Sequence, residues 1–382
     1  FPFAVPQPKP PLIDLKYFGL GQRVSPDLQG ATTMAAVMEK MRADLRQEPG
    51  DKLVERLARY YRPDAGWLAG IWLTVRDLVD LQVIFNDPVL YGVALRAGPK
   101  LRVLNGLKLE VLYQRISDEV GLFYIDLTLP IAFREITMGA WSITLPSIAL
   151  WIYTNGDFKV SLGWPLGERS FTIQYLFLIG GGGFYLAKLS SATAPDMPPP
   201  PQGMTYNPVL AFGIALRLGV GREFNKGILS ASLSLSLFGV FEGRVAWLRP
   251  KTALERMESG EPAGGPTALP PAPPSTELAE ADAAPSLFDY YWFRGTFGIV
   301  GVMQGAVDFA IIKASLTVRL EASVTVTFAT GQPTTIRVYA GVTVRLRVEI
   351  ASFKIFGYRV HIYVDLSFHA NITEEFVIDN RG

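Results

Sequence analysis

The chain has 382 residues, of which 49% are hydrophobic and 19% charged, and its 36 basic and 35 acidic residues leave a net charge of +1. This balance argues against nucleic acid as a partner, because phosphate binding needs a basic excess on one surface. The absence of cysteine excludes disulfides, thiolate metal sites and a cysteine nucleophile.

Residues 1–88 are predicted to form a Pro-rich arm followed by a mostly helical subdomain. The first twelve residues contain five prolines, which fix φ and remove hydrogen-bond donors, so they are expected to be extended. Apolar residues at helical spacing predict a helix over 32–46, capped by a threonine, and a second helix over 51–61. Residues 67–83 fit either a helix or a pair of buried strands.

Residues 89–248 are predicted to form an antiparallel β region, because apolar and polar residues alternate there with a period of two. The clearest hairpin signal is Asn155-Gly156, which lies between two alternating runs and favours a type I′ turn. The run Gly180–Gly183 lacks the spacing of a phosphate-binding loop and indicates a turn, a bulge or tight sheet packing.

Residues 249–286 are rich in proline, alanine and glutamate and nearly lack large apolar side chains, which predicts a disordered loop. Residues 287–382 are predicted to continue the same sheet as a long-strand β meander. The alternating runs there are long compared with the usual strand of about 5–6 residues.

The last three alternating runs place a set of apolar side chains on one face of the predicted sheet. This candidate apolar sheet face consists of Leu316, Val318, Leu320, Val324, Val326, Phe328, Val338, Val342, Val344, Leu346, Val348, Val360, Ile362, Val364, Leu366 and Phe368. Such a face has to be covered by a second sheet or helices, by closure into a barrel, or by an apolar ligand.

The fold class is therefore predicted to be mainly β. Long antiparallel meanders are expected to form a large curved sheet, an open barrel or a sandwich, with a small helical region near the N-terminus.

The sequence contains no catalytic, metal-binding or cofactor-binding motif, and no cofactor is predicted. The two histidines, His361 and His369, lie eight residues apart on one predicted strand, roughly 26 Å at the usual strand rise, which is too far to share a metal ion. Asp126 interrupts an apolar run and is a candidate inward-facing carboxylate. The aromatic residues at 288–293 indicate a strand that re-enters the core, with a membrane-interface belt or ligand platform as the alternative.

Several segments, among them Phe123–Pro130, Ser142–Pro165 and Asp289–Gly301, resemble those of a group of very large, β-rich, uncharacterised bacterial proteins. The resemblance implies a bacterial origin and, together with the absence of an initiator methionine at Phe1, a segment of a longer polypeptide. It implies no activity and assigns no catalytic or binding residue.

These observations predict a non-enzymatic structural or binding segment of a larger bacterial protein. Its long apolar face is expected to hold a lipid-like ligand or another segment of the parent protein. One alternative is a membrane-inserted β-barrel or pore-forming segment, which long alternating strands also fit. The other is an enzyme whose site is assembled from scattered carboxylates. The compartment stays open, with a secreted or cell-surface location compatible with the sequence.

Overall fold

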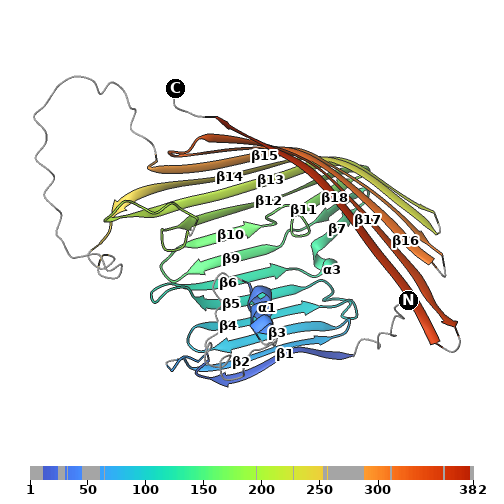
Figure 1. The fold of residues 1–382 in the computed structure, drawn as a ribbon, viewed down its shortest axis with the longest axis horizontal. Helices are drawn as coiled ribbons and strands as arrows, with labels where there is room; N and C mark the ends of the chain where they lie inside the picture. The colour runs from blue at the N-terminus through green and yellow to red at the C-terminus, as the bar shows by residue number, and fades with distance from the viewer. Residues whose placement is uncertain are drawn as a thin grey trace, which may run out of the picture.

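The computed structural model describes most of the chain (Figure 1). The described residues are 12–24, 31, 33–44, 61–63, 65–194, 196–226, 228–252, 256, 288–309, 312–355 and 358–378, with no side-chain description at 223–226, 351–355 and 358–362. The predicted N-terminal arm, the predicted helix over 51–61 and the predicted loop over 249–286 fall largely outside these residues.

Within the described residues the chain forms two helices and one 18-stranded antiparallel sheet that is not closed, which confirms the mainly β fold class. The helices are α1 (Met34–Asp44) and α3 (Ile131–Arg134). The shorter strands are β1 (Ile13–Gln22), β2 (Trp67–Val75), β3 (Val79–Asn86), β4 (Leu90–Ala97), β5 (Lys108–Arg115), β6 (Gly121–Thr128), β7 (Glu135–Met138), β8 (Trp141–Thr144), β9 (Ile148–Tyr153), β10 (Phe158–Leu162) and β11 (Phe171–Tyr175). The longer strands are β12 (Leu178–Leu189), β13 (Met204–Lys226), β14 (Leu229–Pro250), β15 (Tyr290–Asp308), β16 (Ile312–Ala329), β17 (Thr334–Ile355) and β18 (Tyr358–Ile378).

The strands form one continuous antiparallel ladder with a short branch. The ladder runs from β1 through β6, then through β9, β10 and β12, and on to β18. The branch consists of β7, β8 and β11, and it joins the ladder at the first residues of β12. Figure 1 shows the resulting sheet as a curved layer, with β16, β17 and β18 sweeping away from the N-terminal strands.

The glycine run Gly180–Gly183 lies where the partner of one edge of β12 changes from β11 to β10. This junction is called the fork below. A Cβ on Gly183 would lie 2.3 Å from the carbonyl oxygen of Gly163 and 2.8 Å from the nitrogen of Trp164. The prediction of tight sheet packing at Gly180–Gly183 is therefore confirmed.

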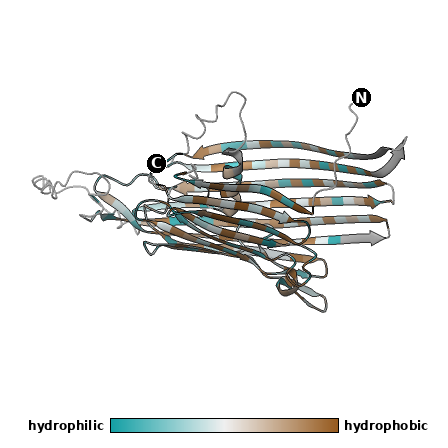
Figure 2. Cartoon of the chain, turned by 90° about the horizontal axis from the view of Figure 1, so that it is seen from below, coloured by the Kyte–Doolittle hydropathy of each residue, from teal (hydrophilic) through white to brown (hydrophobic). Residues whose placement is uncertain are grey.

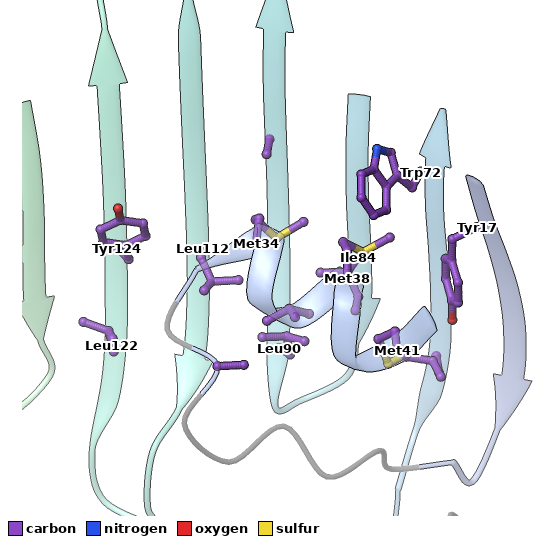
Figure 3. Packing of buried hydrophobic residues seen from close by; sticks show 14 of the residues in the cluster. Tyr17, Met34, Met38, Met41, Trp72, Ile84, Leu90, Leu112, Leu122 and Tyr124 are labelled. Carbon is purple, nitrogen blue, oxygen red and sulfur yellow. The ribbon is translucent and has the colours of Figure 1, made fainter. Parts of the chain in front are cut away.

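Helix α1 packs on one face of the N-terminal half of the sheet, called the helix face below (Figure 3). Its Met34, Val37 and Met38 are fully buried, and they pack in one cluster with Leu90 and Leu112 from the strands beneath. The helical spacing of these methionines and valine is the pattern that predicted the helix. Within the described residues, no helix is long and apolar enough to cross a membrane.

The prediction of a mostly helical region over residues 1–88 is wrong for the residues that the structure describes. Three strands, β1, β2 and β3, lie there beside the single helix α1. The ambiguous segment 67–83 belongs to the β2–β3 hairpin, in which Ile71 pairs with Val83. Its apolar residues fit both the helical period of about 3.6 residues and the strand period of two. The segment forms strands because β2 pairs with β1 and β3 pairs with β4.

The β9–β10 hairpin predicted at Asn155-Gly156 is present, with φ of +84° at Gly156. Asn155 is not among the residues with positive φ, so the turn differs from the predicted type I′. Instead, the Asn155 side chain accepts a hydrogen bond from the backbone N–H of Asp157, a local contact that closes the turn.

Candidate functional site

The largest candidate site is the sheet face opposite α1, called the apolar face below. Cross-strand partners share a face, so the strand registers define which side chains it contains. Along the long strands one such row is Leu218, Leu237, Ile299, Ala322, Ala340 and Ile372, from β13 to β18. Figure 2 shows the corresponding alternation of hydrophobic and hydrophilic residues along these strands.

The apolar face continues without a break into the N-terminal strands. A second row reads Val83, Val93, Val111, Ile125, Leu150, Val160, Leu186 and Phe212, from β3 to β13. The face therefore extends across the ladder from β3 to β18, well beyond the C-terminal strands on which the sequence predicted it.

Large side chains on this face are exposed, with no described part of the chain covering them. Relative exposure is 65% at Leu218, 58% at Leu237, 65% at Phe297 and 60% at Phe368. On the opposite side of β14, by contrast, Ser236 is only 1% exposed. Burying one such apolar side chain is worth about 1.5–3 kcal/mol, so exposure of the whole face in water is strongly unfavourable.

The sixteen predicted face residues lie on β16, β17 and β18, and the registers place those with described side chains on the apolar face. For example, Leu316 pairs with Leu346, which pairs with Leu366. Val360 and Ile362 lie in the part of β18 whose side chains are outside the described set.

Charged side chains are confined to the borders of the apolar face. Among the described side chains of the ladder, the strand registers assign five charged residues to it: Arg115, Lys188, Arg222, Arg249 and Glu374. Arg115 ends β5, and Lys188 is the last but one residue of β12. Glu374 lies on the outer strand β18, and the middle of the face is uncharged on the strands before it.

Aromatic side chains form a band on the apolar face near one end of the strands. Phe85 pairs with Tyr91, Tyr91 with Tyr113, and Tyr113 with Phe123, with ring centroids 5.3, 5.9 and 4.8 Å apart. Phe123 pairs with Ile152, which pairs with Phe158, so the band continues across β9 and β10 at the same level, meaning the same position along the strand direction.

A second aromatic cluster extends this band onto the long strands. It contains Phe212, Phe241, Tyr291, Phe293 and Phe328, with centroid separations between 5.3 and 6.4 Å. Together, the two groups are called the aromatic row below. The aromatic residues at 288–293 are apparent in the sequence, but no local pattern aligns them with Tyr91 or Tyr113.

Aromatic residues also mark the opposite end of the apolar face. Trp141 of β8 pairs with Tyr175 of β11, and their rings stack with centroids 4.3 Å apart. Tyr175 in turn pairs with Leu178 at the start of β12. Phe297 lies between the two levels, whereas Phe368 is level with Arg222, beyond the Trp141–Tyr175 pair.

The helix face is polar along the long strands. Arg345 donates hydrogen bonds to both carboxylate oxygens of Asp365 at 3.0 and 2.5 Å, and Arg337 binds Glu375 at 2.7 Å. The hydroxyls of Thr296 and Thr325 lie 2.9 Å apart. The two faces of one sheet therefore differ sharply in polarity.

A second candidate site is a cavity of about 490 Å³ on the helix face between α1, β4–β6, α3 and the segment before β11. Arg169 reaches into it and donates hydrogen bonds of 2.6 and 2.7 Å to the two carboxylate oxygens of Asp126. Burial acts to lower the pKa of Arg169, but the hydrogen bonds to Asp126 raise the pKa above its usual value. Asp126 thus points toward the helix side of the sheet, as its place in an apolar run suggested.

Glu110 is the cross-strand neighbour of Asp126 and lines the same cavity. One of its carboxylate oxygens accepts a hydrogen bond of 2.6 Å from the backbone N–H of Met34, at the start of α1. The Tyr124 hydroxyl lies 3.2 Å from Asp126. The cavity therefore brings carboxylates, a phenol and a guanidinium together. No local sequence pattern points to Arg169, which is 43 residues from Asp126.

No group of three or more potential metal ligands occurs among the described residues. The ring of His369 contacts the Thr343 hydroxyl and the Asn371 amide, each at 2.9 Å. The side chain of His361 is outside the described set. Asp157 is buried and accepts hydrogen bonds from Ser190 and Thr193, which gives it a structural role beside the hairpin turn.

No family model, curated protein or solved structure matches the chain.

Proposed function

We propose that this chain is a non-enzymatic structural or binding segment whose apolar face holds the hydrocarbon of lipid-like molecules. One observation carries the proposal: an exposed apolar face runs across the ladder from β3 to β18 with charged residues only at its borders. A bacterial parent protein, of which this chain would be one segment, fits the proposal.

The composition of the face favours lipid over a protein partner. Protein interfaces carry about one hydrogen bond per 100–200 Å² and a polar rim. The middle of this face offers aliphatic side chains and phenylalanine, such as Leu216, Phe297 and Val324, which provide no directional contacts. Acyl chains need none, because their binding follows from the apolar area removed from water.

The test is native mass spectrometry of the purified 382-residue chain, combined with organic extraction and lipid analysis. Lipid at a defined stoichiometry is expected. Val324→Lys, in the middle of the apolar face, is expected to lower the bound lipid, whereas Ser323→Lys, on the opposite face of the same strand, leaves it unchanged. A lipid-free wild-type mass in detergent-free buffer would contradict the proposal.

The cavity supports a second candidate function, a site for acid–base chemistry on a small polar molecule. The observation in its favour is that Glu110, Asp126 and Arg169 converge there. The test is an activity screen against ester, phosphoester and glycoside substrates with the wild-type chain and Glu110→Gln. Activity that disappears in the variant would support this function, and activity that persists would exclude Glu110 from it.

A further inference from the structure

We infer that the part of the apolar face between the aromatic row and the Trp141–Tyr175 pair spans the hydrocarbon core of a lipid bilayer, with the aromatic row at one headgroup level and the Trp141–Tyr175 pair at the other. The inference rests on the proposed function and deepens it, because it identifies the lipid as that of a membrane.

The distance between the two aromatic levels fits a bilayer. On β12, Lys188 pairs with Phe158 of the aromatic row, and Leu178 pairs with Tyr175 of the opposite pair. These positions are ten residues apart, which at the rise of a strand is about 33 Å along the strand axis. The hydrocarbon core is about 30 Å thick, and a tilted strand crosses it in about 9–11 residues.

The chemistry at the two levels also fits a bilayer. Tyrosine and tryptophan favour the headgroup region, because their rings are apolar while their O–H and N–H groups need polar partners. On β12 and β13, charged residues on the apolar face begin where the aromatic levels lie, whereas Glu374 of the outer strand β18 is level with Val324. Lys188 is level with Phe158, and Arg222 follows two residues after Val220, the partner of Leu178.

The opposite face has the polarity expected of a surface turned to water. On β14 serine occupies four successive helix-face positions from Ser230 to Ser236, while leucine and alanine occupy the apolar positions between them. On β16, β17 and β18 the helix face carries Arg319, Arg345 and their ion-pair partners Glu321 and Asp365. Polar-in, apolar-out alternation of this kind is the pattern of membrane-spanning strands.

Insertion into a bilayer also requires that the backbone groups at the two sheet edges be paired. Backbone N–H and C=O groups cannot stay unpaired in hydrocarbon, where each costs several kcal/mol. The sheet is not closed, and its outer strands are β1 and β18. Within the described residues, β1 pairs with β2 and β18 pairs with β17. In the membrane-inserted form, both outer strands must therefore gain strand partners.

The test uses single-cysteine variants, which the cysteine-free chain allows without further substitutions. An environment-sensitive fluorophore is attached at Val324→Cys in the middle of the apolar face, at Phe123→Cys in the aromatic row, or at Ser323→Cys on the helix face. Each labelled full chain is refolded in the presence of phosphatidylcholine–phosphatidylglycerol vesicles. These vesicles contain lipid brominated either near the chain end or near the ester group.

The label at Val324 is expected to be quenched most by bromine near the chain end, and the label at Phe123 most by bromine near the ester group. The label at Ser323 is expected to stay unquenched. Equal quenching at Val324 and Ser323, or a deeper position for Phe123 than for Val324, would overturn the inference. Circular dichroism identifies any variant that fails to fold, and labels at Leu216 and Tyr113 then replace those at Val324 and Phe123.

The two proposals fail separately. Absence of vesicle quenching while the purified chain carries lipid at fixed stoichiometry removes the bilayer inference and leaves the proposed function standing. Absence of both quenching and bound lipid removes both.

Discussion

Arg169 and Asp126 lie 43 residues apart in sequence, yet they form a two-point ion pair with N–O distances of 2.6 and 2.7 Å. The pair ties the segment before β11 to β6 across the cavity on the helix face. The Asp126 side chain is 14% exposed and that of Arg169 is 38% exposed, so solvent screens the pair only in part.

Asp126→Asn is expected to lower the free energy of unfolding by about 1–2 kcal/mol, because it removes charged hydrogen bonds in a partly buried setting. Urea denaturation followed by circular dichroism measures the change. Asp365→Asn is the matched control, since its pair with Arg345 lies on an exposed part of the long strands, where a smaller loss is expected. Equal losses in the two variants would show that the cavity gives the Arg169–Asp126 pair no added strength.

Met38→Ala is expected to cost about 2–5 kcal/mol, because Met38 is fully buried under α1 and its truncation leaves a cavity. Met303→Ala makes the same chemical change at a 49% exposed position on the apolar face, where a change of about 0.5 kcal/mol or less is expected in lipid-free buffer. Chemical denaturation of both variants tests the difference. A small effect of Met38→Ala would mean that α1 does not hold to the sheet as described.

Gly183→Ala is expected to destabilise the fork by about 1–3 kcal/mol, because the added methyl would overlap the backbone of Gly163 and Trp164. Gly305→Ala is the control, since a Cβ at Gly305 meets no atom within 4 Å. Thermal unfolding and amide hydrogen exchange in β10 provide the measurements. Unchanged exchange in β10 would contradict the close packing at the fork.

Tyr113→Leu combined with Phe123→Leu keeps the aromatic row apolar but removes a ring pair whose centroids are 4.8 Å apart. If the row lies at the headgroup level, vesicle binding is expected to weaken roughly two- to tenfold, the equivalent of about 0.5–1.5 kcal/mol. Phe297→Leu, between the two aromatic levels, is expected to leave binding unchanged. Vesicle flotation at several lipid concentrations measures the affinity, and equal loss in both variants would argue against an interfacial role for the row.

Local sequence patterns were sufficient to predict the mainly β class, helix α1, the β9–β10 hairpin and the two-sided character of the C-terminal strands. These features depend on local periodicity: alternation with period two assigns Val318 and Arg319 to opposite faces in any antiparallel pairing. Likewise, the spacing of Met34, Val37 and Met38 predicts one buried helical face without reference to distant residues.

Other features depend on strand register and on contacts between distant segments, and these arise only in the folded chain. Pairing with β1 and β4 selected strands for residues 67–83, whose apolar residues fit two periods. The registers aligned Tyr113 with Phe123 and brought Trp141 onto Tyr175, and together they created the two aromatic levels. Packing of α1 on one face of the N-terminal strands left the other face exposed, and no local pattern specifies which of two faces a distant helix covers.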